Sequence, residues 1–138
     1  MKLYKFSKKE RIYTYADFQK IIKKGGVFFC YPFRCMYVTS PADKFEMKVA
    51  LSVSKRNVKL SVDRNRIKRM IREAYRLQKN EILTTHLHLK NEILILLIYI
   101  EKKEIPYTIL QKQLNILLNR LIKINLKNDV KNIMISNN

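Results

Sequence analysis

The sequence predicts an α+β fold in which helices pack on one sheet, in the order α-β-β-(β)-α-β-α, where the bracketed strand is short. Three stretches favour this class. Residues 47–54, MKVALSVS, alternate apolar and polar positions, as a half-buried strand does. Residues 93–100, ILILLIYI, form a short run rich in isoleucine, which is typical of a buried strand. Residues 108–122 repeat leucine at helical spacing, which is typical of a helix with one apolar face.

The first predicted helix begins at residues 14–17, TYAD. These match the capping signature in which Ser or Thr precedes an acidic residue by three positions. Apolar residues then follow at helical spacing, namely Phe18, Ile21 and Ile22. The pair Gly25-Gly26 is predicted to end the helix.

The next predicted element is a strand over residues 28–39, FFCYPFRCMYVT, which is rich in aromatic and β-branched residues. Pro32 cannot donate a backbone hydrogen bond, so we expect it at the start of this strand or on a sheet edge. Residues 40–45, SPADKF, have the composition of a turn. The strands at 28–39 and 47–54 are therefore predicted to pair as a hairpin.

A basic connector at residues 55–62 has room for a short third strand and leads to the longest predicted helix. This helix runs from about Asp63 to Asn80. Residues 81–92 favour no single structure. The last helix is predicted to begin near Thr108, and the Asn- and Lys-rich residues 127–138 to form a flexible tail.

The composition predicts one domain, at residues 14–126, preceded by a basic arm at residues 1–13. Hydrophobic residues make up 47% of the chain, which is not the composition of a disordered protein. Lysine and arginine number 29 against 11 acidic residues, which gives a net charge of +18. Such an excess favours a polyanionic partner. Nucleic acid is the first candidate, and an anionic membrane surface is the second.

The membrane hypothesis is the weaker of the two. A spanning helix needs about 20 apolar residues, and the longest apolar run is residues 93–100. The N-terminus has no continuous apolar stretch, so no signal peptide is expected and the cytoplasm is the expected compartment. Cys30 and Cys35 are then expected to be free, packed thiols, because no second Cys pair or nearby His would complete a zinc site.

Residues 64–76, RNRIKRMIREAYR, contain five arginines, one lysine and a single acid. On a helical wheel of about 100° per residue, one side is apolar and comprises Ile67, Met70, Ile71, Ala74 and Leu77, with Tyr75 at its edge. The other side comprises Arg64, Asn65, Lys68, Arg69, Arg72, Arg76 and Lys79. Arg66 falls outside this basic arc. The helix is predicted to pack one face on a core and to present the other to an external partner.

A basic helical face is most often simply solvated. This one lacks the glutamates that usually accompany lysine on such a face. Arginine predominates on it, and arginine is the better bidentate partner for phosphate and for guanine. We therefore expect phosphate or base contacts. Strands surround the helix and no helix-turn-helix accompanies it, which favours a folded RNA over DNA.

Three blocks of the sequence resemble the bacterial ribonuclease P protein component. They are DFQKIIKKG (17–25), LSVSKR (51–56) and RNRIKRMIREAYR (64–76), and the resemblance covers roughly residues 8–122. It implies a four-stranded, mainly antiparallel sheet with the order α-β-β-β-α-β-α, in which the basic helix forms a left-handed crossover. Residues 57–63 depart from the family pattern, because this connector has no Gly and is one residue longer.

The resemblance also implies a function. In that family an RNA subunit with bound Mg²⁺ removes the 5′ leader of precursor tRNA, and the protein holds the leader. We accordingly expect no catalytic residue in this protein and no Mg²⁺ held by its side chains alone. The resemblance assigns contact with the RNA subunit to Arg64, Asn65, Arg66, Lys68, Arg69 and Arg72. Arg76, on the same basic face, is expected to contribute to this contact. It assigns the leader to a cleft between the first helix and the sheet, at Phe18, Ile22, Arg34, Met36, Ser52, Lys55 and Arg56.

Other candidate sites are weaker. His86 and His88 have no third ligand in view, so metal binding there is not expected. Asp17 and Asp63 are better explained as acids at helix N-termini than as a nuclease pair. Phe18 is expected to pack, with base stacking as its alternative role. Two other functions stay open: a structural RNA-binding protein with no role in cleavage, and a basic amphipathic membrane binder. The oligomeric state is undetermined, and a monomer is expected.

Overall fold

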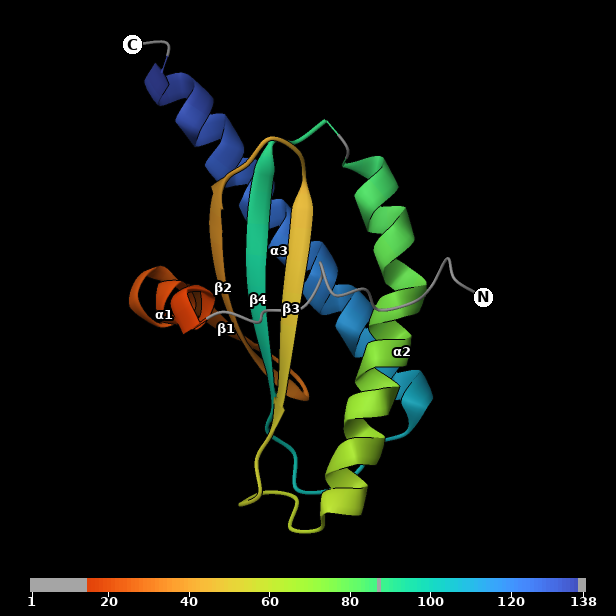
Figure 1. Ribbon diagram of the computed structural model, residues 1–138. Coiled ribbons are helices and arrows are strands. Elements are labelled where there is room, and N and C mark those ends of the chain that lie inside the picture. The colour runs from red at the N-terminus through yellow and green to blue at the C-terminus, as the bar shows by residue number, and fades with distance from the viewer. Residues whose placement is uncertain (1–14, 87, 137–138) are drawn as a thin grey trace.

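The computed structural model describes residues 15–86 and 88–136, so the predicted arm at residues 1–13 lies outside the described part of the chain. Seven elements follow one another in the predicted order, α-β-β-β-α-β-α (Figure 1). They are α1 (Tyr15–Lys24), β1 (Gly26–Cys30), β2 (Phe33–Pro41), β3 (Glu46–Val53), α2 (Ser61–Thr85), β4 (Asn91–Tyr99) and α3 (Tyr107–Ser136).

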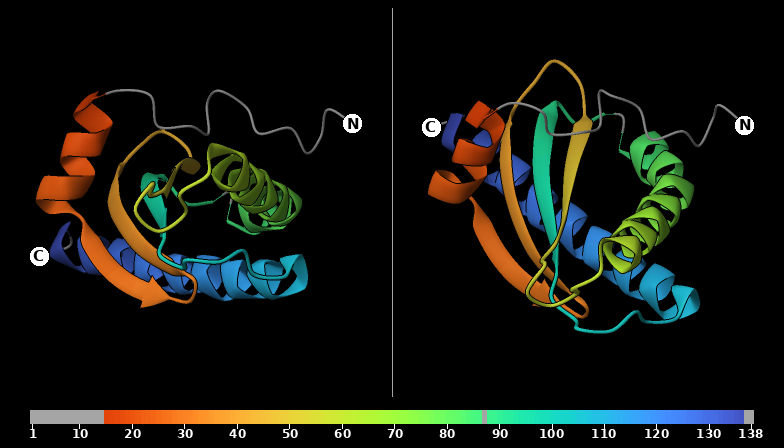
Figure 2. Two further views of the ribbon diagram at one scale, coloured as in Figure 1. Left: turned by 90° about the horizontal axis from the view of Figure 1, so that it is seen from below. Right: turned by 60° about the horizontal axis from the view of Figure 1, so that its bottom comes forward.

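The four strands form one mixed sheet with the order β1-β2-β4-β3. The pairs β1–β2 and β2–β4 are antiparallel, whereas β3 and β4 are parallel. Helix α2 connects the two parallel strands, and the crossover is left-handed, as the resemblance implies (Figures 1 and 2). The predicted mainly antiparallel sheet is thus confirmed, with one parallel pair at the β3 edge.

The helices cover both faces of the sheet in three layers (Figure 2). Helix α1 packs on one face, where Ile21 and Leu94 are both fully buried. Helices α2 and α3 pack on the other face and enclose the larger core with β4 residues such as Ile93 and Ile95. Because β4 buries apolar side chains on both of its faces, it lies in the interior of the sheet.

The predicted strand at residues 28–39 is wrong as a single strand, because Tyr31 and Pro32 form a turn between β1 and β2. Pro32 lies directly before β2, as expected for a residue that cannot donate to a ladder. The additional strand that was expected within residues 55–62 is therefore found earlier in the chain, as β1. Residues 55–60, where the sequence left room for that strand, form a turn and an irregular stretch before α2.

The predicted hairpin between β2 and β3 is also wrong, because β4 lies between these two strands. An alternating pattern shows which side chains face the core, but it does not identify the neighbouring strand. The run of residues 93–97 is apolar on both faces, which suits the central position where α1 covers one face of the sheet and α2 and α3 cover the other.

Helix α1 has the predicted bounds and ends where the N–H of Gly25 donates to the carbonyl of Ile21. A Cβ on Gly25 would lie 2.6 Å from the carbonyl oxygen of Tyr37 in β2, so only glycine fits this tight exit. Helix α2 continues five residues beyond its predicted end, to Thr85. Helix α3 continues through Ser136 into the predicted tail, whose flexibility stays a prediction.

Candidate nucleic-acid interface

The start of α2 is held in place by Arg64. Its Nη1 donates hydrogen bonds to the backbone carbonyls of Val58, at 2.9 Å, and Lys59, at 2.8 Å. Val58 is itself buried in the main core. The connector is therefore held both by the side chain of Val58 in the core and by the hydrogen bonds from Arg64. The side chain of Arg64 therefore fixes the path of the connector, and only its remaining N–H groups are available to a partner.

Two other arginines of α2 form ion pairs within the protein. Arg66 binds Glu104 through Nε at 2.7 Å and Asp63 through Nη2 at 3.0 Å, and the hydrogen bond to Glu104 raises the pKa of Arg66. Arg76 binds Glu73 at 2.5 Å. Arg66 lies outside the basic arc, as predicted, and its two acidic partners reduce its attraction for an external anion.

Four further polar residues near the start of the helix have no acidic partner among the described residues. Asn65, Arg69 and Arg72 are exposed, and Lys68 is half-buried. Among the described residues, no acid forms an ion pair with Lys68, Arg69 or Arg72. We call Asn65, Lys68, Arg69 and Arg72 the α2 basic face. Three neighbouring cations without internal counter-charges form a surface suited to a polyanion.

The packing face of α2 is rotated relative to the predicted one. Lys79 was predicted on the basic face but is buried, with 4% of its surface exposed. Leu77 was predicted in the core but is 42% exposed. Tyr75, predicted at the edge, is fully buried. The reason is that α2 contacts both α3 and the edge strand β3, so its buried stripe turns toward the space between these neighbours.

The α1 side of the sheet carries the second group of predicted site residues. Met36, Leu96 and Ala50 occupy paired positions across β2, β4 and β3, and they pack against the cluster beneath α1. A second row of side chains lies on the same face, two residues away from the first row on each strand. It consists of Phe29, Arg34, Ile98 and Ser52, at paired positions of β1, β2, β4 and β3. We call this second row the open row.

The open row is only partly covered. Arg34 is exposed, Ile98 and Ser52 are half-buried, and Phe29 is 65% exposed. Phe18 of α1 is half-buried against the neighbouring cluster, so it has the packing role expected of it and keeps part of its surface open. Apolar, aromatic and cationic groups thus lie together on one accessible strip.

The seven predicted leader residues therefore do not all lie together. Phe18, Met36, Arg34 and Ser52 are associated with the α1 side of the sheet. Lys55 and Arg56 are exposed in the turn that follows β3, just beyond Ser52, where the N–H of Arg56 donates to Ser54 Oγ. Ile22 is 61% exposed and is not part of the cluster around Ile21.

Sequence reasoning missed Phe29 and Ile98. The signal for Phe29 was present, since Phe28 and Phe29 are consecutive and strand alternation must turn one of them outward. It was hidden because β1 was not recognised as a separate strand. Ile98 was read as part of a buried run, but it is half-buried.

Cys30 and Cys35 are free thiols, as expected. Burial raises the pKa of Cys35 to about 12. His86 and His88 lie with ring centroids 6.3 Å apart, and burial lowers the pKa of His86. The described residues include no group of three or more His, Cys, Asp or Glu side chains placed to hold a metal ion. Within the same residues, no helix is long and apolar enough to cross a membrane.

Fold and surface together define a small basic α+β protein with a cation-bearing helix and a half-open sheet face. The family model described as Ribonuclease P matches residues 6–122. The chain therefore belongs to the ribonuclease P protein family.

Individual relatives agree with this assignment. The chain is 36% identical over 89 residues to the ribonuclease P protein component of Porphyromonas gingivalis, a match that covers 64% of this chain and 59% of that one. It is 38% identical over 79 residues to the same component of Dictyoglomus turgidum, covering 57% of this chain and 64% of that one. The chain thus spans about three fifths of the length of these relatives.

Solved structures show the same architecture. The RNase P protein of Staphylococcus aureus is 29% identical, with a TM-score of 0.60 and coverage of 81% of this chain and 94% of that one. The RNase P protein of Thermotoga maritima is 22% identical, with a TM-score of 0.62 and coverage of 80% and 96%. At that lower identity, the second similarity concerns the fold alone.

Proposed function

We propose that this protein is the protein subunit of ribonuclease P, which binds the catalytic RNA and the 5′ leader of precursor tRNA and assists removal of the leader. The observation that carries the proposal is the family match over residues 6–122. The unpaired cations of the α2 basic face support it, since they provide a surface for a polyanion.

The RNA subunit binds along α2 in this proposal. Lys68, Arg69 and Arg72 contact its phosphates, and Asn65 lies among them. Arg64 contributes mainly by holding the connector, because its Nη1 already bonds two carbonyls. Arg66 and Arg76 contribute less than the outward cations, because acids of the protein already pair with them.

The leader binds on the open row in the same proposal. A single strand needs stacking surfaces for its bases and cations for its phosphates. Phe29 offers an exposed ring, and Arg34 lies directly opposite it in the β1–β2 pair. Lys55 and Arg56 extend the positive charge beyond the end of β3. Magnesium is held mainly by RNA in this scheme, and the holoenzyme works in the cytoplasm.

Cleavage of precursor tRNA at low magnesium tests the proposal. The RNA subunit of the same organism is assayed with and without the protein, on substrates with and without a leader. We expect the protein to restore cleavage and the restoration to depend on the leader. If the protein restores nothing and binds this RNA no better than an unrelated folded RNA, the structural RNA-binding function takes its place.

Phe29→Ala tests the position of the leader. Loss of a stacked base costs about 1–3 kcal/mol, so binding of leader-bearing substrate should weaken while binding of mature tRNA stays unchanged. Ile116→Ala removes another exposed apolar side chain, on α3, and serves as the matched control. Equal effects of the two variants would place the leader elsewhere.

A further inference from the structure

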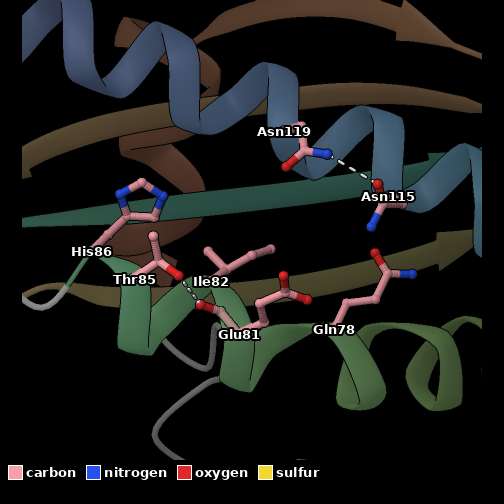
Figure 3. Close-up of a pocket in the computed structure, with 7 residues that line it drawn as sticks. All are labelled: Gln78, Glu81, Ile82, Thr85, His86, Asn115 and Asn119. Atoms are coloured by element: carbon pink, nitrogen blue, oxygen red, sulfur yellow. Dashed lines mark hydrogen bonds between the residues drawn. The ribbon is translucent and has the colours of Figure 1, made fainter.

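A polar pocket of about 250 Å³ lies between the C-terminal half of α2 and α3. Seven residues line it, and all but Ile82 are polar: Gln78, Glu81, Ile82, Thr85, His86, Asn115 and Asn119. Figure 3 shows the side chains of Gln78 and Glu81 extending from α2 toward α3, where Asn115 and Asn119 face them. The pocket lies further along α2 than the α2 basic face and on another element from the open row.

Hydrogen bonds within the protein fix the amide groups of this pocket. Gln78 donates through Nε2 to the carbonyl of Gln111 at 3.0 Å. Asn119 donates through Nδ2 to Oδ1 of Asn115 at 3.0 Å. These bonds leave Oε1 of Gln78 and Oδ1 of Asn119 as acceptors and Nδ2 of Asn115 as a donor. The carboxylate of Glu81 adds two further acceptor oxygens.

The pocket is therefore rich in unused acceptors. Oε1 of Gln78 and Nδ1 of His86 are enclosed and have no hydrogen-bond partner among the described residues. Glu81 forms no ion pair within the same part of the chain. Enclosed polar atoms without a protein partner suit a polar occupant, and the free acceptors of this pocket favour one that brings donors.

The charge of the protein narrows the choice of occupant. With a net charge of +18, the molecule repels small free cations and attracts polyanions. The occupant should carry hydrogen-bond donors without being a free cation, and it should belong to a polyanion. An unpaired RNA base meets both requirements. Guanine alone among the standard bases presents two adjacent N–H donors, N1–H and N2–H, which match one carboxylate. Its O6 and N7 can accept from an Asn amide.

Two lysines of α3 stand on either side of the asparagines. Lys112, Asn115, Asn119 and Lys123 follow one another at helical spacing, so they lie on one stripe of the helix. Both lysines are exposed, and neither has an ion-pair partner among the described residues. They lie about 16 Å apart at 1.5 Å per residue, so phosphates on both sides of an inserted base could each meet one.

We propose that the pocket between α2 and α3 receives one unpaired guanine of a bound RNA. Glu81 accepts from N1–H and N2–H, Asn115 donates to O6 or N7, and Lys112 and Lys123 bind the flanking phosphates. The inference does not depend on the role in ribonuclease P, because a guanine pocket could serve any single-stranded RNA.

Binding of short oligoribonucleotides to the full chain tests the proposal. Four pentamers, each a uridine strand with G, A, C or U at the centre, are compared by fluorescence anisotropy at fixed salt. We expect the central guanine to bind about tenfold more tightly than the other three bases. Equal binding of all four strands overturns the proposal without any need for a variant.

Variants locate the preference. Glu81→Gln should abolish the guanine preference, although it raises the net charge by one and would by charge alone strengthen binding. Asp43→Asn makes the same charge change at an exposed turn residue, so it should retain the preference. Lys112→Ala should weaken all four strands equally. A guanine preference that survives Glu81→Gln places the base elsewhere and overturns the proposal. Cleavage of precursor tRNA is measured separately, so failure of either proposal leaves the other standing.

Discussion

At the scale of single residues, Arg72 is the clearest candidate for a phosphate contact. It is exposed on the α2 basic face, and no described acid pairs with it. Each lost phosphate contact lowers the slope of log K against log salt by about one unit. We therefore expect Arg72→Ala to weaken binding of the RNA subunit and to flatten the salt dependence by about that amount. Binding titrations at several salt concentrations measure both quantities.

Lys90→Ala is the matched control for this variant. Lys90 is exposed before β4, so its loss lowers the net charge equally but removes no residue of the α2 basic face. We expect a smaller loss of affinity and little change of slope. If Lys90→Ala and Arg72→Ala have the same effect, the protein attracts RNA by its overall charge and the α2 basic face has no special contact.

Cys35 gives a prediction about reactivity and pH. It is fully buried, and burial raises its pKa from 9.0 to about 12. The reactive species is the thiolate, so Cys35 should resist alkylation in the native protein at pH 8 and react once the protein unfolds. The thiol of Cys35 ionises at lower pH in the unfolded chain than in the native protein. The contribution of Cys35 to the free energy of unfolding should therefore be lost as the pH rises from about 9 toward about 12. Mass spectrometry after alkylation checks the first statement, and rapid native labelling of Cys35 would contradict it.

At the scale of elements, Ile21 is the buried residue through which α1 packs most closely on the sheet. Ile21 is fully buried and packs with Leu94 in the apolar cluster between α1 and the sheet. Deleting a buried isoleucine side chain to alanine costs about 2–5 kcal/mol. We expect Ile21→Ala to lower the free energy of unfolding by an amount in this range and to loosen α1. Denaturant titration measures the loss.

The neighbouring Ile22 is the control for this prediction. It is 61% exposed, and an exposed residue usually changes stability by no more than about 0.5 kcal/mol. Ile22→Ala should therefore leave the unfolding curve nearly unchanged. In the proposed function it should weaken leader binding if the leader reaches α1. Similar destabilisation by both variants would mean that α1 does not pack through Ile21.

At the scale of the whole molecule, the net charge of +18 opposes folding through self-repulsion. An anion that binds only the native state stabilises it by mass action. We expect a few millimolar sulfate to raise the melting temperature more than chloride of the same ionic strength. The double variant Arg69→Ala, Arg72→Ala should show a smaller gain, because it lacks two outward cations of the α2 basic face. Equal gains in both proteins would indicate a general salt effect.

Elements with a strong local pattern were predictable. The apolar run of β4 indicates burial, the leucine stripe of α3 indicates an amphipathic helix, and the glycines after α1 indicate a tight turn. The division of residues 28–39 into β1 and β2 was not predictable in the same way. Aromatic residues continue across the turn, so composition alone gives no boundary there.

The candidate site divides similarly. Charge segregation predicted the outward position of Arg69 and Arg72, because a cation without a counter-charge seeks water or an anion. It could not predict that Lys79 is buried while Leu77 is exposed, since the orientation of α2 follows from its two neighbours. The pairing of Arg66 with Glu104 joins residues 38 positions apart, and no local pattern shows such a contact.

The sequence by itself determined the class of fold, the three helices, the apolar strand at residues 93–100, the basic face and the family resemblance. These depend on periodicity, composition and short motifs, which are properties of neighbouring residues. Only the tertiary structure decided that β4 lies between β2 and β3, that the open row includes Phe29 and Ile98, and that polar side chains of α2 and α3 meet in a pocket. Those features depend on contacts between segments far apart in the sequence, which no pattern of neighbouring residues specifies.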